Sequence, residues 1–270
     1  MEIEGTERVD GLEHYYKPIE NLDGVSTVLF WVSAALSIAV LYSRVIPWQP
    51  LRDVPMLLFA AIVVLNLILT LYLKYHLIPI AEGKRRKQLL SDSFDAPLTP
   101  EQTRAYYNNP LAPSIRRLGA NVLENAFFAK AVCGKMAVRE RVKVLIYFIA
   151  WILAAMCRST PLEVLVVVTQ TLFSGEIIAR LVCIEVLRHR NEDLFDELYH
   201  EFLHKVDFRS STGTACILDA FATYEAAKAA SGIKQSTKVF KALNPDLTRQ
   251  WSDICNKLGM TEKSSGNANT

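Results

Sequence analysis

The sequence predicts an all-α membrane protein with four transmembrane helices, arranged as two hairpins, and a helical cytoplasmic region. Three observations lead to this fold class. Hydrophobic residues make up 51% of the chain and charged residues only 21%, and soluble domains usually carry more charge. The charges gather at the ends and in the middle of the sequence, so the segments between them are strongly apolar. These apolar segments come as two pairs, and a short turn containing proline separates the members of each pair.

This pattern divides the chain into consecutive segments. They are an acidic N-terminal segment (1–24), a first transmembrane hairpin (25–80), a basic cytoplasmic segment (81–143), a second and more polar transmembrane hairpin (144–187), a cytoplasmic helical domain (188–259) and a disordered tail (260–270). In the first hairpin, the apolar runs at 25–46 and 56–78 are long enough for the roughly 20 residues that cross the hydrocarbon core of a bilayer.

The distribution of charge predicts the topology. The basic segment contains 12 Lys and Arg against 6 Asp and Glu, an excess of +6, whereas residues 1–24 contain seven acids and two bases. Four crossings leave both termini and the basic segment on one side, and the positive-inside rule places that side in the cytoplasm. An acidic start does not fit a signal peptide, and five cysteines without CxxC spacing favour a reducing compartment.

Polar residues within the apolar runs are candidates for lining a pore. They are Asn66, Gln170, Ser174, Glu176 and Arg180. Ionisable residues inside a membrane are costly and usually face the interior of a helix bundle or water. Two alternatives stay open. Asn66 could instead pair with a neighbouring helix, and the membrane could end near Ser174, with Glu176 and Arg180 paired on a helix that continues into the cytoplasm.

The basic segment offers candidates for binding an anionic ligand. A helical pattern starts after Pro113, contains no proline before Pro161 and is expected to run directly into the third apolar run. The basic residues proposed as ligand contacts are Arg116, Arg117, Lys130, Lys135, Arg139 and Arg141. Lys and Arg neutralise phosphates, and the aromatic residues Tyr106, Tyr107, Phe127 and Phe128 could stack on bases. The alternative is attraction to anionic lipid, which suits 84–87 and 139–143 because they flank the membrane.

Shorter elements are also predicted. Thr99, Pro100 and Glu101 have the pattern of a helix start, and a short helix is expected from there to Asn108. Four helices are predicted in the C-terminal domain: one with an apolar face from Leu194 to Val206, one at 215–230 with Gly232 as its cap, one that begins at Ser236, and one that begins at Asn244-Pro245 and runs to Leu258.

One motif keeps an enzymatic alternative open. His200, Glu201 and His204 match HExxH, in which two histidines one helical turn apart bind Zn²⁺ and the glutamate polarises a water molecule. Glu225 lies at a spacing that suits a third ligand. However, both histidines fall opposite the apolar face of the predicted helix, beside acidic residues, which is typical of a solvated surface. The preferred prediction is therefore a protein without catalytic residues, metal or cofactor.

Four stretches resemble a known family: SDSFDAPLTPEQTRAYYNN, NVLENAFFAK, DAFATYEAAKAASGI and KVFKALNPDLTRQW. They are similar to bacterial four-transmembrane anti-phage effectors associated with a nucleotidyltransferase, in particular the membrane effectors of Hailong-type defence. The resemblance covers most of residues 80–258. It rests on the amino-acid sequences of these stretches and on their order in the chain, and it assigns no ligand-binding residue.

The resemblance implies a function, a location and partners. Such effectors are homo-oligomers, here expected as a tetramer, that form a pore in the bacterial inner membrane and depolarise it. A partner nucleotidyltransferase makes single-stranded DNA oligomers, which bind an electropositive cytoplasmic chamber and hold the pore closed. Two alternatives remain beside this prediction: a membrane zinc metalloprotease that uses the HEFLH motif, and a non-catalytic scaffold that recruits a partner through its C-terminal helices.

Overall fold

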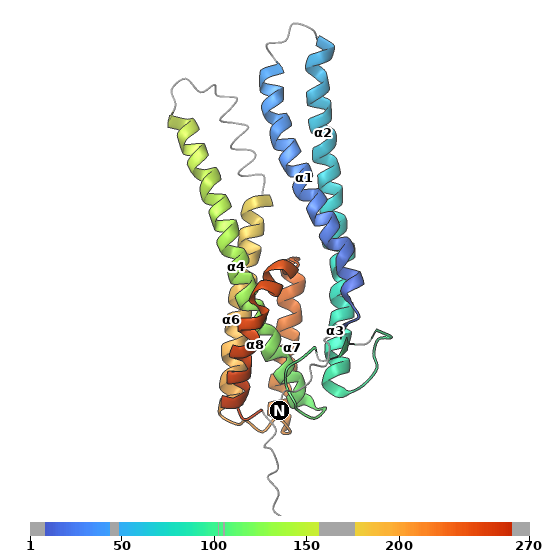
Figure 1. Ribbon diagram of the computed structural model, residues 1–270, viewed down its shortest axis with the longest axis vertical. Coiled ribbons are helices and arrows are strands. Elements are labelled where there is room, and N and C mark those ends of the chain that lie inside the picture. The colour runs from blue at the N-terminus through green and yellow to red at the C-terminus, as the bar shows by residue number, and fades with distance from the viewer. Residues whose placement is uncertain (1–8, 44–48, 102, 105, 157–175, 261–270) are drawn as a thin grey trace, which may run out of the picture. The chain divides into compact units, whose positions relative to one another are not determined.

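The computed structural model describes residues 9–43, 49–101, 103–104, 106–156 and 176–260. The described helices are α1 (Glu13–Ser43), α2 (Gln49–Tyr72), α3 (Ile78–Phe94), α4 (Ile115–Met156), α6 (Glu176–Leu203), α7 (Ser211–Ser231) and α8 (Thr237–Lys257), with a π-helical turn, η1 (Leu73–Leu77), between α2 and α3 (Figure 1). Two strands of two residues each, β1 (Val9–Asp10) and β2 (Thr103–Arg104), pair antiparallel. The predicted all-α class is confirmed. The tail predicted at 260–270 lies, from residue 261 on, outside the described residues.

The chain divides into two compact units. We call residues 1–12, 82–136 and 184–270 the helical unit, and residues 13–81 and 137–183 the apolar unit. Helices α3, α4 and α6 contribute residues to both units, whereas α1 and α2 belong to the apolar unit and α7 and α8 to the helical unit. The units therefore change at 82, 137 and 184, inside continuous helices. The predicted segment starts at 81, 144 and 188 describe membrane boundaries and stay predictions.

In the apolar unit, large hydrophobic side chains are exposed. In the part of the chain that the structure describes, one helix is long and apolar enough to cross a membrane. It runs from Asp53 to Phe94 through α2, η1 and α3, and its most apolar window has a mean hydropathy of 2.6 with none of it buried. The chain thus has a candidate membrane span, while four crossings, the oligomer and the side on which each terminus lies stay predictions.

Helices α1 and α2 lie side by side in the apolar unit (Figure 1). Near the start of α1, Ile19 packs with Leu73 of η1 and Ala81 of α3 in a small buried cluster. Farther along, the Ser26 hydroxyl donates to the Asn66 side-chain oxygen at 2.8 Å. α1 begins at Glu13, so half of the predicted N-terminal segment is in fact the first turns of this helix.

The long helix predicted after Pro113 is present as α4, which continues without interruption to Met156. Ser114 starts it, because the Ser114 hydroxyl accepts a hydrogen bond from the backbone N–H of Arg117 at 3.2 Å. The first part of α4 lies in the helical unit and is buried from Leu118 to Ala129 at almost every position, whereas its last part carries exposed side chains such as Leu145 and Leu153.

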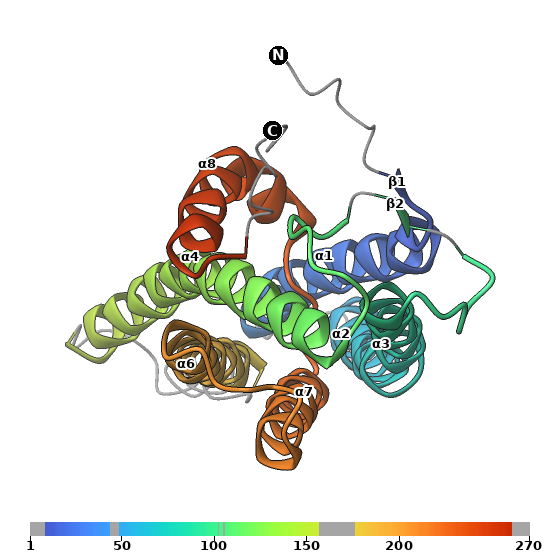
Figure 2. The ribbon, with the colours of Figure 1, turned by 90° about the horizontal axis from the view of Figure 1, so that it is seen from below.

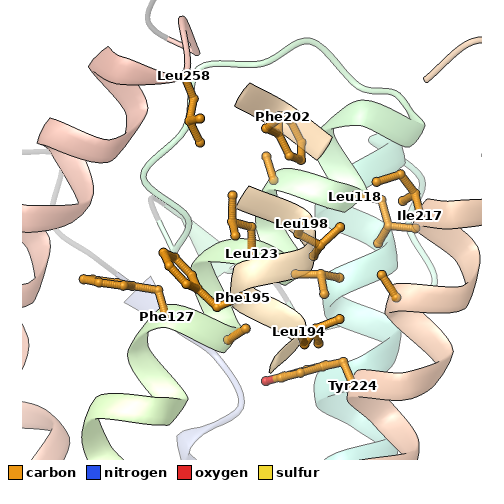
Figure 3. Packing of buried hydrophobic residues seen from close by; sticks show 14 of the residues in the cluster. Leu118, Leu123, Phe127, Leu194, Phe195, Leu198, Phe202, Ile217, Tyr224 and Leu258 are labelled. Carbon is orange, nitrogen blue, oxygen red and sulfur yellow. The ribbon is translucent and has the colours of Figure 1, made fainter. Parts of the chain in front are cut away.

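The core of the helical unit forms around the buried part of α4. Figure 2 shows α4 between α8 and α6. Phe127 of α4 contacts Phe195 of α6 at 5.6 Å and Trp251 of α8 at 6.0 Å between ring centroids. Figure 3 shows side chains of α4, α6 and α7 converging on the same cluster, including Leu118 and Ile217. This core fixes the elements that carry the candidate site.

Two local predictions are wrong. No helix forms in the described residues between Phe94 and Ile115. Thr99 does not cap a helix there, because its hydroxyl donates to the carbonyl of Glu101 at 3.0 Å instead of accepting from a backbone N–H. The two helices predicted from Ser236 and Asn244 are one helix, α8, which contains Pro245 in its interior.

Other caps are confirmed. Ser236 caps α8 by accepting from the backbone N–H of Val239 at 3.3 Å, and Gly232 ends α7 with a positive φ of 56°. α7 begins at Ser211, before the predicted start at 215, because Ser210 caps it by accepting from the backbone N–H of Gly213.

Candidate functional site

All six predicted ligand contacts lie on α4, but they do not form one surface. At about 100° per residue, Arg116, Lys130 and Arg141 fall on one side of the helix and Arg117, Lys135 and Arg139 on another, roughly 130° away. The set is also divided between the units, since Arg139 and Arg141 belong to the apolar unit. A single patch of six cations on this helix therefore does not exist.

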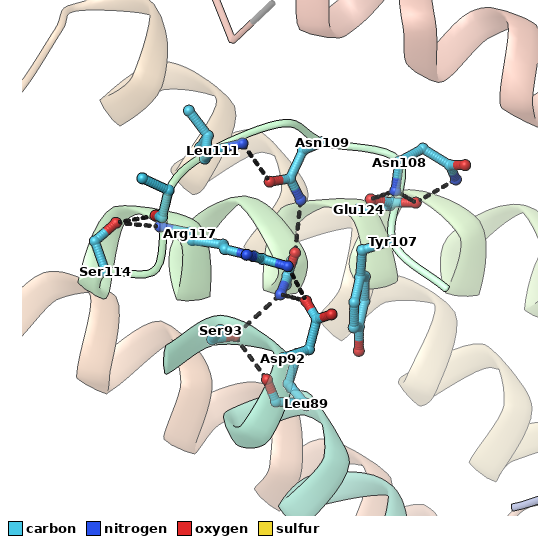
Figure 4. Close-up of polar contacts among 12 residues, drawn as sticks. Leu89, Asp92, Ser93, Tyr107, Asn108, Asn109, Leu111, Ser114, Arg117 and Glu124 are labelled. Carbon is cyan, nitrogen blue, oxygen red and sulfur yellow. Dashed lines mark hydrogen bonds and ion pairs between the residues drawn. The ribbon is translucent and has the colours of Figure 1, made fainter. Parts of the chain in front are cut away.

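Arg117 is part of a structural network (Figure 4). Its guanidinium donates to Asp92 of α3 at 3.1 Å, and the same carboxylate oxygen accepts from the Asn121 amide at 3.0 Å. The Asn121 amide also contacts the Ser93 hydroxyl at 3.0 Å, and its oxygen accepts from Asn109 at 2.6 Å. These bonds hold α3 and the loop before α4 against α4, and within them Arg117 is occupied in holding α3.

Glu124 anchors the same loop (Figure 4). Its carboxylate, almost completely buried, accepts from the backbone N–H of Asn108 at 3.0 Å and from the Asn108 side chain at 2.6 Å. A buried carboxylate is stable when such hydrogen bonds satisfy it. Asn108 and Glu124 belong to two of the four stretches that carry the family resemblance. These two stretches are thus in direct contact in the fold.

Lys130 sits against aromatic rings. Its ammonium group lies 3.5 Å from the ring centroid of Phe195 and 6.0 Å from that of Phe127. Burial lowers the pKa of Lys130, and the nearby Asp196 and Glu192 act in the opposite direction. The side chain is half-buried over the core, so covering the rings is its main role here.

Arg116 and Lys135 are the predicted contacts that remain accessible in the helical unit. Both are exposed and have no ion-pair partner among the described residues. Arg139 in the apolar unit is exposed in the same way, while Arg141 is exposed but engaged in another interaction.

A second basic group, which sequence reasoning assigned only to membrane flanking, surrounds Arg85 of α3. The Arg85 guanidinium donates to both carboxylate oxygens of Asp10, at 3.1 and 2.8 Å, and lies 4.7 Å from the ring centroid of Tyr106. Its neighbour Lys84 donates to Glu101 at 3.0 Å. In the sequence, this contact was indicated only by the opposite charges of the Lys-Arg-Arg-Lys run and the acidic N-terminal segment. The fold brings Asp10 to Arg85.

A charged triad lies near this group in the helical unit. Lys228 of α7 pairs with Glu82 of α3 and, at 3.4 Å, with Glu225 one turn earlier on its own helix. Burial raises the pKa of Glu225, and the Lys228 charge partly offsets this effect. Burial also raises the pKa values of the Tyr107 and Tyr224 phenols, which therefore stay neutral.

The HExxH residues do not assemble into a metal site. His200 and His204 are exposed, with ring centroids 4.1 Å apart, and α6 ends between them at Leu203. Glu225 is engaged with Lys228, as described above. No group of three or more His, Cys, Asp or Glu residues able to hold a metal ion occurs among the described residues. No observation therefore favours the protease alternative with Glu201 as its catalytic residue.

The predicted pore-lining residues have different fates. Asn66 accepts from Ser26 of α1, which fits the alternative of helix pairing. Gln170 and Ser174 lie outside the described residues, as does the side chain of Glu176 at the start of α6.

Arg180 joins three helices of the apolar unit. Its guanidinium contacts Asp23 of α1 at 3.3 Å and Glu140 of α4 at 3.8 Å, and Glu140 also pairs with Lys143 at 2.9 Å. Two positions after Glu140 and Arg180 in the sequence, Val142 and Val182 are apolar and exposed. In the described residues Arg180 is thus an interhelical contact, which the sequence prediction of an in-helix pair with Glu176 did not include.

The buried cysteines are unreactive. Burial raises the pKa of Cys133 and of Cys255 to about 12, and in Cys255 the charge of Glu124 adds to this effect. Thiols with such pKa values are protonated at neutral pH and are poor nucleophiles.

Neither a family model, nor a curated protein, nor a solved structure matches this chain.

Proposed function

We propose that this protein is a membrane effector of bacterial anti-phage defence. It forms an oligomeric pore, expected as a tetramer, that depolarises the membrane, and an anionic ligand bound to the helical unit holds the pore closed. The ligand is a nucleotide or a single-stranded DNA oligomer supplied by a partner nucleotidyltransferase. Two observations support this proposal: the family resemblance of residues 80–258, and the division of α4 between the helical unit and the apolar unit.

The division of α4 is the observation that carries the proposal. Residues Ile115 to Met136 of this helix lie in the helical unit, where most are packed in the core, and residues Ala137 to Met156 lie in the apolar unit with exposed apolar side chains. A continuous helix is stiff, so a ligand that shifts its buried part also acts on its apolar part. This is the arrangement that a ligand-controlled membrane protein needs.

The charges of the apolar unit support a closed state with defined helix contacts. Arg180 connects α6 to α1 and α4 through Asp23 and Glu140. Because ions at the edge of an apolar layer are costly when unpaired, this set of contacts favours one arrangement of the helices. A change in that arrangement provides a physical route to opening.

Arg116 and Lys135, which lie on different sides of α4, are the residues of this helix that we assign to the ligand as two separate contacts. Both are exposed in the helical unit and lack an ion-pair partner among the residues that the structure describes. Their charges attract phosphates without first breaking a contact inside the protein.

The test is ion flux through liposomes that contain the purified protein, measured with and without a short oligothymidylate. We expect flux without the oligonucleotide and a clear decrease when it is added. The double variant Arg116→Gln, Lys135→Gln should need more oligonucleotide for the same decrease.

The matched control is Arg249→Gln, because Arg249 is also exposed but pairs with Asp246 on α8. This variant should respond like the unaltered protein. The absence of flux under every ligand condition overturns the proposal of a pore.

A further inference from the structure

We infer that Arg85 and Tyr106 form a binding site for a phosphate group that carries a planar base, and that Asp10 occupies this site as an internal competitor. The inference rests on the proposed function, because it names further contacts and a regulation for the same anionic ligand. It concerns a different helix, α3. The sequence prediction already included Tyr106 as a residue that could stack on a base, but it did not include Arg85 or Asp10 at a ligand site.

The geometry around Arg85 is that of an occupied anion site. Both nitrogens at the end of its guanidinium donate to the two oxygens of Asp10, and the side chain is mostly buried. Tyr106 lies beside the guanidinium, 4.7 Å from ring centroid to the central carbon of Arg85. All three residues belong to the helical unit.

The chemistry of Arg85 suits a phosphate as well as a carboxylate. A guanidinium presents two parallel N–H groups, and these match two oxygens of either anion. The guanidinium lies over one face of the Tyr106 ring, so a base carried by the phosphate would stack on the face that Arg85 does not cover. Arg86 and Lys87, which follow on α3, are exposed and add positive charge without an ion-pair partner among the described residues.

Asp10 is a partner that can leave. It lies 75 residues from Arg85 in the sequence. Among the described residues, its segment pairs with the loop before α4 through two residues, Val9 opposite Arg104 and Asp10 opposite Thr103. The Asp10 side chain keeps 30% of its surface exposed, so solvent reaches this ion pair. The buried residue of the segment is Leu12, which can stay in place while Asp10 turns away.

The ion pair of Arg117 and Asp92, unlike that of Arg85 and Asp10, is not suited to displacement by a ligand. Asp92 lies on α3 itself, and its carboxylate also holds Asn121, which in turn holds Ser93 and Asn109. A ligand that displaced Asp92 would leave these groups without their partners, and unsatisfied buried groups are costly. Displacement of Asp10 instead leaves only the Leu12 backbone N–H, which Asp10 accepts at 3.1 Å, to find a solvent partner.

The position of Arg85 gives the site a regulatory consequence. Arg85 lies on the helix from Asp53 to Phe94 that is the candidate membrane span. A ligand at Arg85 therefore binds directly to the extramembrane end of that helix. The acidic segment around Asp10 sets the ligand concentration at which this happens, because ligand and carboxylate exclude each other.

The experiment measures the affinity of the purified full chain for a fluorescent oligothymidylate and for inorganic polyphosphate, which has no bases. Asp10→Asn keeps the oxygen that accepts from Leu12 but removes the charge that competes for Arg85. We expect it to raise the affinity for both probes roughly tenfold, the effect of losing one charge-assisted contact. The control Glu13→Gln removes an exposed charge nearby and should change both affinities far less.

Arg85→Gln should weaken the binding of both probes, and Asp10→Asn should have no effect when it is combined with Arg85→Gln. Tyr106→Leu should weaken the binding of oligothymidylate about tenfold and leave polyphosphate unchanged, because only the first probe has bases to stack. If Arg85→Gln does not fold, Arg85→Lys replaces it, since lysine keeps the charge but lacks the two parallel N–H groups of the guanidinium.

Equal effects of Asp10→Asn and Glu13→Gln, or unchanged binding to the Arg85 variants, overturn the inference. Equal effects of Tyr106→Leu on both probes overturn the assignment of a base. Because binding is measured without ion flux, a protein that binds as expected but conducts no ions overturns only the proposed pore.

Discussion

The helical unit and the apolar unit place the same kind of side chain in opposite environments. In the helical unit Leu198 and Trp251 are almost completely buried, whereas Leu57 in the apolar unit keeps 67% of its surface exposed. Water drives the first arrangement, because apolar side chains leave it by packing together. The second arrangement is stable only where the surroundings are themselves apolar, as lipid is.

The two units also differ in how their polar and apolar side chains are arranged. In the helical unit, ions are paired across helices and the polar groups in Figure 4 are bonded to one another. In the apolar unit, many large apolar side chains are exposed, and Arg180 forms an ion pair between helices.

The largest effect is expected from removing a core side chain. Trp251→Ala should lower the free energy of unfolding by about 3–5 kcal/mol, because it leaves a cavity in the helical unit. Leu57→Ala in the apolar unit should change it by less than about 1 kcal/mol, because the side chain has few packed neighbours. Chemical unfolding of the detergent-solubilised protein checks this, and similar losses at both positions would contradict the contrast.

The second test compares two leucines of similar exposure, Leu65 at 53% and Leu218 at 49%. Leu65→Lys should impair membrane integration, since a lysine at the centre of a span costs about 2.5–3.5 kcal/mol. Leu218→Lys should integrate normally, because its side chain already faces water. The fraction of each variant that stays in carbonate-washed membranes measures the difference, and equal fractions would remove the distinction between the units.

The third test compares two glycines of α4. A Cβ atom on Gly119 would lie 2.5 Å from Ile217, which is buried, whereas one on Gly134 would lie 3.6 Å from Arg188, an ordinary contact. Gly119→Ala should destabilise the protein, since overpacking costs about 1–3 kcal/mol. Gly134→Ala should stabilise it by up to about 1 kcal/mol through helix propensity. Thermal unfolding measures both, and a stabilising Gly119→Ala would mean that α4 and α7 are not closely packed.

The fourth test concerns the ion pair of Arg180 and Glu140. A double-mutant cycle with Arg180→Gln and Glu140→Gln should give a coupling of about 0.5–1 kcal/mol, because Glu140 is largely buried while Arg180 is partly solvated. The control cycle with Arg249→Gln and Asp246→Asn, an exposed pair on α8, should give a coupling near zero. Equal couplings would show that the apolar unit does not strengthen its ion pair.

The smallest effect is the pH dependence due to Glu225. Burial raises its pKa in the folded protein, so the folded state binds the proton more tightly than the unfolded chain does. The free energy of unfolding therefore falls as the pH rises from the ordinary pKa of glutamate through the raised one. Glu225→Gln should remove this fall, so its stability relative to the unaltered protein should increase from about pH 4 to pH 7. A constant difference over that range would contradict it.

Local patterns in the sequence predicted most of the helices. The absence of proline and the helical spacing after Pro113 predicted α4 along its whole length, and Ser236 and Gly232 mark helix ends where the structure has them. Helix formation depends on neighbouring residues, so it can be read locally. The same reasoning failed at Pro245 and Thr99, where packing of α8 and hydrogen bonds of the loop outweigh the local preference.

The candidate site could be predicted only in part. The residue types and the helical pattern were enough to show which residues are cationic and that one long helix carries seven of them. The contacts of these cations depend on the fold: Arg117 is bound to Asp92, Lys130 lies on Phe195, and Asp10 reaches Arg85. The physical reason is distance along the chain. A charge pattern is a property of neighbouring residues, whereas the partner of each charge is brought from 25 to 75 residues away by the fold.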